Sequence, residues 1–483
     1  MRNDRYCSQV SRPTVLVFAV LLAAVVVQSP IAVFAQSQSY SVEDPSAVHD
    51  PLLGSVPSGR ASSEPMRLTI LDALDRGLKY NLGIVLSQQG STAAAAQRYR
   101  ALSALLPNVN AHLADSYQQA SLISYGLPLS PGENPILGPF SLTDMRAALN
   151  VNIFDFSAFN NYRSAKENVR AAKFSYQNTR DLVVLVVGYQ YLSALADQSR
   201  VEAAQAQFNT AETLYKQALD LHNAGMVPGI DVLRAQVEMQ SQQQRLLERR
   251  NEYDKQLISV GRVLGLPGGQ AIILADKIPP PAPLPHTMQE DIERARENRS
   301  DYKQVQAALE AALHARRAAV SERLPSASFS GDYGTIGSSP VKNHETFTVA
   351  ASVHIPVFEG GRIKGDIMQA DAELERSRAQ FLDLGERIDY EVRVAFLDYE
   401  SATQQLEVAT SNLDLARQQV AQSRDRFAAG VTNNVEVVQA QEAQATAEEN
   451  YISSLFSHDF SKLSLARAVG IAEDATRKFL GGK

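Results

Sequence analysis

The chain of 483 residues has one cysteine and no tryptophan. The cysteine, Cys7, lies in a basic leader segment, so we expect the mature chain to contain no thiol. Disulfide bonds, thiol chemistry and a lipid anchor on cysteine are then excluded. The eight histidines are scattered and form no HExxH or other close metal-ligand spacing. The sequence therefore predicts no metal and no cofactor.

Long apolar runs are also scarce. The one of note, TVLVFAVLLAAVVV at residues 14–27, follows Arg2, Arg5 and Arg12. This order is typical of a secretory signal peptide over residues 1–35, with an uncleaved signal anchor as the alternative. No later segment offers the 18 or more apolar residues that a membrane-spanning helix needs.

An excess of basic residues is missing as well. The chain has 46 Lys and Arg against 53 Asp and Glu, a net charge of −7. An exported acidic chain is a poor partner for nucleic acid. The glycine turns lack the GxxxxGK[ST] pattern that cradles phosphate, and no Ser/His/Asp set stands out, so we predict no enzyme.

The most informative feature present is a turn that occurs twice, 205 positions apart. It reads LHNAGMVPGIDVLRAQ at residues 221–236 and RFAAGVTNNVEVVQAQ at residues 426–441. Asp231 in the first copy matches Glu436 in the second. This duplication indicates that a helical hairpin is the repeating unit of the chain.

A heptad of alternating small and large residues precedes each turn. The second copy has Ala402, Leu406, Ala409, Leu413, Ala416, Val420, Ser423 and Phe427, and the first has Val201, Ala204, Phe208, Ala211, Tyr215, Ala218 and His222. A strict seven-residue period is typical of supercoiled helices. Proline is absent from about residue 157 to 224 and from 361 to 429, so each helix could run close to 70 residues. For His222 we expect a packed imidazole.

Strand patterns are duplicated too. Apolar and polar residues alternate over about 108–121 and 142–154 in the first copy, and over about 325–334 and 345–356 in the second. Such strands fit either a transmembrane barrel or a half-buried soluble sheet. Four strands cannot close a barrel, so the first interpretation requires oligomers.

These patterns divide the chain into segments. We expect a signal peptide at 1–35, a flexible Ser-, Pro- and Gly-rich arm at 36–65, a first structural repeat at 66–278, a Pro-rich linker at 279–286, a second repeat at 287–471 and a C-terminal tail at 472–483. The hairpin turns fall at about 224–231 and 429–436. Each repeat reads helix, strand, strand, long helix, turn, helix.

Taken together, these features resemble those of the TolC-type outer-membrane efflux proteins. The resemblance rests on LTILDALDRGLKYN at 68–81, IPVFEGGR at 355–362 with its weaker partner NIFDF at 152–156, and the two turns. It implies a mainly α-helical fold with a transmembrane β-barrel portion: a trimeric 12-stranded barrel in the bacterial outer membrane on a long coiled-coil tunnel in the periplasm.

The resemblance also implies a function. The protein would be a passive exit duct of a tripartite efflux or type I secretion system, opened at its periplasmic tip, with a periplasmic adaptor, an inner-membrane pump and outer-membrane lipid as partners. The alternative is an exported coiled-coil structural or adhesive surface protein without a transport role.

By the same resemblance the turns acquire roles. The positions of a pore constriction match Asp231, Glu436 and Gln439, and three copies would bring up to six carboxylates around one axis, where like charges raise each other's pKa and attract cations. Alternatively, each acid only complements the positive end of the following helix. Phe427 and Thr432 occupy the positions of a polar turn lock, so we expect this turn to be held by packing, without polar links.

Docking of the adaptor is the last role implied. The matching positions are Ala224, Gly225, Met226, Val227, Ala429, Gly430, Val431 and Thr432. Small residues there permit close approach of a partner backbone. Alternatively, each glycine only ends its helix by adopting the left-handed backbone conformation, without a role in docking.

Overall fold

The computed structural model describes residues 50–126, 134–276, 287–339, 341–429, 431–432 and 434–479. The chain divides into a unit that ends at Val48 and a unit that begins at His49, and all described residues belong to the second. The expected signal peptide, residues 36–49 of the arm and the Pro-rich linker lie outside the described residues.

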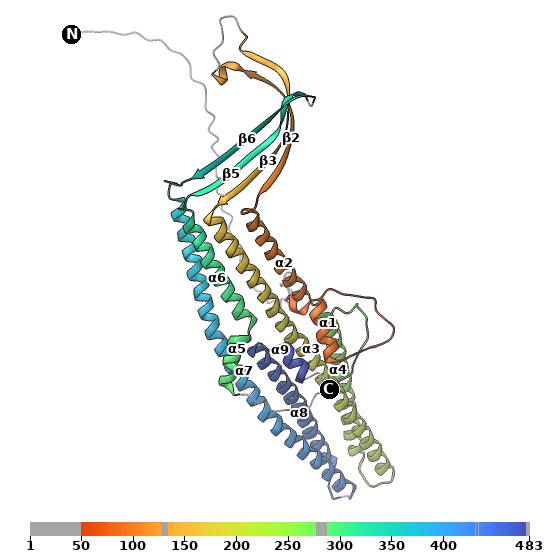
Figure 1. The fold of residues 1–483 in the computed structure, drawn as a ribbon. Helices are drawn as coiled ribbons and strands as arrows, with labels where there is room; N and C mark the ends of the chain where they lie inside the picture. The colour runs from red at the N-terminus through yellow and green to blue at the C-terminus, as the bar shows by residue number, and fades with distance from the viewer. Residues whose placement is uncertain are drawn as a thin grey trace, which may run out of the picture. The chain divides into compact units, whose positions relative to one another are not determined.

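The described unit is mainly helical (Figure 1). The first repeat contains α1 (Ile70–Tyr80), α2 (Leu82–Ser103), α3 (Phe156–Asn223) and α4 (Gly229–Val263). The second contains α5 (Met288–Asn298), α6 (Ser300–Ser321), α7 (Arg362–Ala428) and α8 (Asn434–Val469), followed by α9 (Ala472–Phe479). The described unit also contains short elements: η1 (Pro51–Leu53), β1 (Met66–Leu68), η2 (Leu122–Tyr125) and β4 (Ile272–Leu274).

The two long helices have the predicted length. α3 has 68 residues and α7 has 67, or about 100 Å each at 1.5 Å per residue. α3 begins where the Asp155 carboxylate accepts a hydrogen bond from the amide of Ala158, and it ends before Gly225, whose φ of 75° only glycine adopts readily. The expectation of helices close to 70 residues is confirmed.

The heptad of the second copy is buried. Every member from Ala402 to Ser423 is buried, and Phe427 is half-buried. In the first copy the alanines are buried and Val201, Phe208 and Tyr215 are half-buried. Accordingly, α3 packs along α4 and α7 along α8, each pair forming a hairpin. His222 is the exception, because its side chain is exposed rather than packed in the seam.

Four strands form one antiparallel sheet at the end of the helices opposite the hairpin turns (Figure 1). They are β2 (Asn108–Ser121), β3 (Ile136–Phe154), β5 (Ser326–Ser339) and β6 (Lys342–His354), in the order β2-β3-β5-β6. β3 begins six residues before the expected 142. Gly138 and Pro139 are typical of a loop, yet pairing with β2 continues as far as Ser121 with Ile136. For the same reason β5 extends past the expected 334, since its pairing with β6 continues to Ser339.

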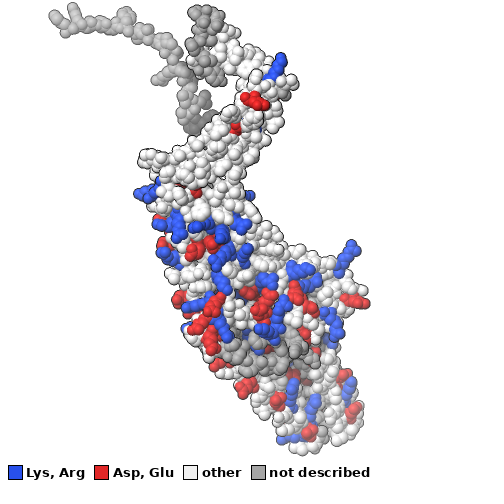
Figure 2. All heavy atoms as spheres, viewed as in Figure 1, with Lys and Arg blue, Asp and Glu red and all other residues white. Residues whose placement is uncertain are grey.

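The two faces of the sheet differ in polarity. Val109, Leu149, Gly331 and Val349 lie across from one another in the four strands and share one face with other apolar residues. On the opposite face Arg146 pairs with Asp144 at 2.7 Å and with Asp332 at 3.1 Å. Figure 2 shows that charged side chains gather on the helices, while the strands are mostly uncharged. Among the described helices, none is both long and apolar enough to cross a membrane.

The largest core lies midway along α3. Val183, Val187 and Tyr191 pack there against α1, α4 and the parallel pair β1–β4. The hydroxyl of Tyr191 lies within hydrogen-bond distance of two acceptors, the Leu68 carbonyl oxygen at 2.9 Å and the Asp276 carboxylate at 2.8 Å. A second core joins α5, α7 and α8 around Leu384, Ile388 and Val392.

A buried ion cluster lies beside the second core. The guanidinium of Arg299 is only 3% exposed, and it contacts Asp301 at 2.6 Å and Glu391 at 2.6 Å. Arg467 of α8 contacts the same Glu391 at 3.0 Å. The cluster therefore ties the α5–α6 junction to α7 and α8 by charge as well as by packing.

Asp181 of α3 provides a test of this region. Burial raises the pKa of Asp181 to about 6, although Arg467 and Arg180 oppose the shift. Because this pKa is raised in the folded state, the folded protein binds more protons between pH 4 and 6, and its stability falls as pH rises through that window. We expect Asp181→Asn to raise the free energy of unfolding by about 1–2 kcal/mol at pH 7.5 and to leave it unchanged below pH 4.

Guanidinium titration in detergent at the two pH values measures this effect. Asp220→Asn, at an exposed position near the end of the same helix, is the matched control. An equal free energy of unfolding for wild type and Asp181→Asn at pH 7.5 would contradict the expectation.

Candidate functional site at the hairpin turns

Both hairpin turns lie at the ends of the long helices remote from the sheet (Figure 1). In the first turn the amide of Gly225 donates to His222 and the amide of Met226 donates to Leu221, both at 2.9 Å. Pro228 then precedes α4. Proline has no amide hydrogen, but an amide at this position would have no partner within the helix, so no helical hydrogen bond is lost. The sequence thus ends one helix and starts the next within a few residues.

His222 bridges the first turn. Its Nδ1 lies 2.9 Å from the carbonyl oxygen of Val227, so Nδ1 carries a proton and donates it. The ring also packs near Gly229, where an added Cβ would lie 3.6 Å from His222 Cε1. The expectation of an imidazole packed in the helical seam is therefore wrong, because the side chain reaches across the turn instead.

Asp231 lies in the first turn of α4. Its side chain is only 14% exposed and pairs with Arg234 of the same helix at 3.2 Å. Its position also places it at the positive end of the α4 dipole. In a single chain, the charge of Asp231 is thus largely compensated within its own hairpin.

The second turn is held by polar contacts. Arg426 Nε of α7 lies 3.3 Å from Glu436 Oε1 of α8, and the Thr432 hydroxyl donates to Glu436 Oε2. The expectation that this turn lacks polar links is wrong. A single carboxylate accepts from both sides of the turn, because the hairpin brings the last turn of α7 next to the first turn of α8. Phe427 is half-buried and borders a cavity of about 390 Å³ between α7 and α3.

The two copies differ in how they close the turn. The positions 205 residues before Arg426 and Thr432 are Leu221 and Val227, both apolar. The first turn therefore uses the His222 imidazole, and the second uses the Arg426–Glu436 pair. Arg426 is not among the site residues predicted from the sequence. A signal was available, since both positions that flank the turn change from apolar to polar between the copies.

The remaining predicted site residues lie on the surface. Ala224, Gly225, Met226, Ala429, Val431 and Gln439 are exposed, and Val227 and Thr432 are half-buried. Gly430 lies outside the described residues. Met226 is 72% exposed and Val431 is 68% exposed, so each tip presents an apolar side chain among small ones.

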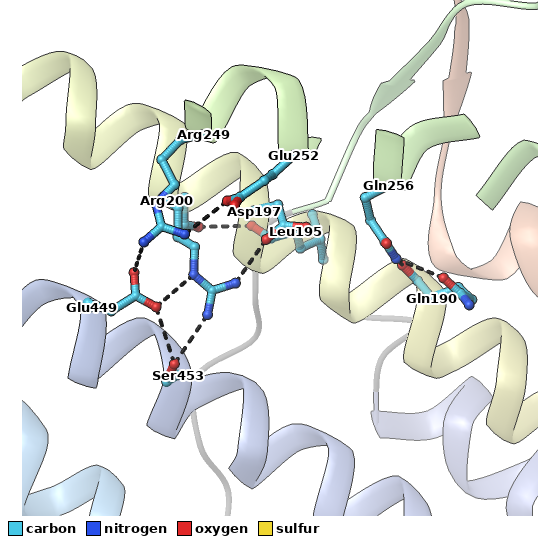
Figure 3. A network of polar contacts seen from close by, with 10 residues as sticks. Gln190, Leu195, Asp197, Arg200, Arg249, Glu252, Gln256, Glu449 and Ser453 are labelled. Carbon is cyan, nitrogen blue, oxygen red and sulfur yellow. Dashed lines mark hydrogen bonds and ion pairs between the residues drawn. The ribbon is translucent and has the colours of Figure 1, made fainter. Parts of the chain in front are cut away.

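A polar network joins the two hairpins above their tips (Figure 3). Glu449 of α8 accepts from Arg200 of α3 at 2.9 Å and from Arg249 of α4 at 3.4 Å. The arginines are held in turn by Asp197 and Glu252, each at 2.9 Å. The sequence does not predict this network, because its members are far apart in the chain and follow no common period.

Comparisons with known proteins give a consistent result. A family model described as outer membrane efflux protein matches residues 78–266 and 292–470. The alkaline protease secretion protein AprF of Pseudomonas aeruginosa is 23% identical over 338 residues, which cover 67% of this chain and 68% of AprF.

Solved structures are similar in fold. The CmeC outer membrane channel of Campylobacter jejuni has a TM-score of 0.74 and 16% identity, over 88% of this chain and 92% of CmeC. The MtrE outer membrane channel of Neisseria gonorrhoeae, solved in an open state, has a TM-score of 0.71 and 16% identity, over 86% of this chain and 95% of MtrE.

Proposed function

The chain belongs to the outer membrane efflux protein family, and on this premise we propose that three copies assemble into one duct, with a 12-stranded barrel and a tip that opens in the periplasm. The protein is an outer-membrane exit duct with a periplasmic helical tunnel, and it is a channel rather than an enzyme. The finer statements concern its assembly, its partners and its opening.

The observation that carries the proposal is the open sheet with one apolar face. β2 and β6 are its edges, and an edge in lipid would leave backbone groups unpaired at several kcal/mol each. The apolar face of β3 runs from Met145 to Ile153, about 27 Å at 3.4 Å per residue. A tilted strand of this length suits the apolar band of a membrane barrel, about 25 Å tall. Pairing β2 of one copy with β6 of the next would satisfy both edges.

Exposed apolar stripes on the helices support the same assembly. α4 carries Ile230, Leu233, Val237, Leu247 and Ile258, and α7 carries Tyr390, Val394, Leu397, Val408 and Leu415. Both sets fall on a seven-residue repeat, and all members are exposed in the single chain. A second copy would cover them as supercoiled helices cover one another.

The tips support docking of further partners. We assign an adaptor to residues 224–227 and 429–432, where apolar Met226 and Val431 stand exposed among small residues. An inner-membrane pump would complete a tripartite efflux or type I secretion system. AprF is named for secretion of an alkaline protease, and CmeC and MtrE are named as channels.

Single-channel conductance in planar bilayers tests the proposal. The purified protein should form a heat-modifiable trimer that conducts, and Arg426→Ala should shift the tip toward its open state. An exposed ion pair contributes roughly 0.5 kcal/mol, so loss of three pairs should raise the open fraction roughly tenfold.

Arg417→Ala serves as the control. It removes an exposed arginine of α7 whose distance to Asp414 is 4.0 Å, without touching the turn. A soluble monomer that never conducts would overturn the duct assembly. Identical conductance of wild type and Arg426→Ala would overturn the assigned role of the second turn.

A further inference from the structure

The junction between the sheet and the helices is ringed by exposed apolar side chains. These residues are Leu106, Ile153, Phe154, Phe156, Phe159, Leu324, Ile355, Val357 and Phe358. Val357 is 91% exposed and Phe358 is 87% exposed, in the loop between β6 and α7. Ile153 is the last residue of the apolar face of β3, and apolar side chains continue beyond the strand ends, where a membrane barrel carries its aromatic girdle.

Cations follow immediately on the helix side of this ring. We define the cationic belt as Arg98 and Arg100 of α2, Arg163 and Lys166 of α3, Arg317 of α6, Arg323 after α6, and Lys364 of α7. All are exposed except the half-buried Arg98. Figure 2 shows Lys and Arg side chains gathered on the helices just beneath the strands.

Helix packing places members of the belt at a common depth. Asn160 Nδ2 lies 3.3 Å from Ser321 Oγ, so the start of α3 lies beside the end of α6. Arg163 lies three residues after Asn160, and Arg317 lies four residues before Ser321. Both arginines are therefore about one helical turn from that contact. Side chains tilt toward the N-terminus of their helix, and the N-terminus of α3 is at the sheet, so Arg163 and Lys166 reach back toward the apolar ring.

The belt has no acidic partners in the described part of the chain. Two members instead lie over aromatic rings, Arg163 over Phe159 at 4.6 Å and Arg98 over Tyr99 at 4.9 Å. Arg316 and Arg362, at the same depth, are paired with carboxylates.

Several less exposed arginines farther from the sheet are paired with acids. Arg180, Arg200, Arg299 and Arg467 each contact a carboxylate at 3.0 Å or less. Other cations far from the sheet, such as Arg245 and Lys255, are exposed as well. The belt is distinguished by its position, where an apolar surface gives way to a charged one.

We propose that the cationic belt binds the anionic headgroups of phospholipids in the membrane leaflet that faces the helices. This inference rests on the proposed function, because it needs the strands in the membrane. The headgroup phosphate supplies the missing negative partner, and the apolar ring fixes the depth at which the cations meet it. Three copies would close the belt around the duct and fix its height in the membrane.

Native mass spectrometry of the detergent-solubilised trimer tests this. Titration with phosphatidylglycerol and with phosphatidylcholine should show at least a fivefold preference for the anionic lipid, weakening as salt screens the charges. R163Q/K166Q/R317Q/R323Q should lower the preference below twofold. R245Q/R250Q/K255Q/R417Q removes four exposed cations far from the belt and should keep the preference for the anionic lipid.

Three outcomes would overturn the inference. The first is an equal preference in wild type and the belt variant, and the second is an equal loss in the belt variant and the control. The third is loss of the lipid preference in inorganic phosphate, but not in chloride of the same ionic strength, which would indicate a free-anion site.

Conductance in pure phosphatidylcholine separates the two proposals. A conducting trimer without lipid preference overturns only the belt, whereas failure to conduct overturns the duct assembly and the belt with it.

Discussion

Arg299→Ala is expected to lower the free energy of unfolding by about 3–5 kcal/mol, a large share of the 5–15 kcal/mol typical of a folded domain. The reason is burial. The guanidinium is 3% exposed, and its removal leaves Asp301 without its closest cationic partner and Glu391 without one of its two close ones. Glu391 would keep Arg467 at 3.0 Å and the more distant Arg387 at 3.8 Å. Burial alone would raise the pKa of Asp301, and the Arg299 guanidinium holds it below its ordinary value. Without Arg299, the burial effect would dominate.

Guanidinium titration in detergent, followed by circular dichroism, measures this loss. Arg296→Ala is the matched control, because Arg296 is 51% exposed and pairs with Asp389 at 2.9 Å. Its removal should change the free energy by less than about 1 kcal/mol. Arg299→Lys should restore only part of the loss, since an ammonium cannot contact two carboxylates in the fork geometry of arginine. Equal effects of Arg299→Ala and Arg296→Ala would show that the buried cluster does not hold these helices together.

Val349→Arg is expected to reduce assembly in the outer membrane by about 2–4 kcal/mol per chain. Val349 lies in the middle of the apolar stretch of β6, between Phe347 and Val353, and is 65% exposed in the single chain. In the proposed barrel, this position faces lipid near the midplane, where an arginine is least tolerated. The yield of heat-modifiable trimer in outer-membrane fractions measures the effect.

The neighbouring residue gives a strict control. Thr348 is also exposed and belongs to the same strand, but its side chain lies on the opposite, polar face. Thr348→Arg should therefore leave the trimer yield nearly unchanged. Equal yields for the two variants would contradict a barrel with its apolar face toward lipid.

The candidate site was only partly predictable. The duplicated turns, the acids Asp231 and Glu436 and the exposed residues at the tips could be located from the register of the two copies. Their contacts could not, because several side chains near a helix end could reach an acid and only the folded hairpin selects Arg426 and Thr432 as partners of Glu436. Arg426 and Glu436 are ten residues apart, and only the closed hairpin brings them to 3.3 Å.

The sequence by itself determined the lengths of α3 and α7, the two helical hairpins and the alternation of the strands. These features arise from local rules: absence of proline, a seven-residue period and a two-residue period. Only the tertiary structure decided the extra length of β3, the burial of Arg299 and the polar contacts at Glu436 and Glu449. Each of these depends on how one helix or strand is aligned with another, and no periodic pattern within a single segment records that alignment.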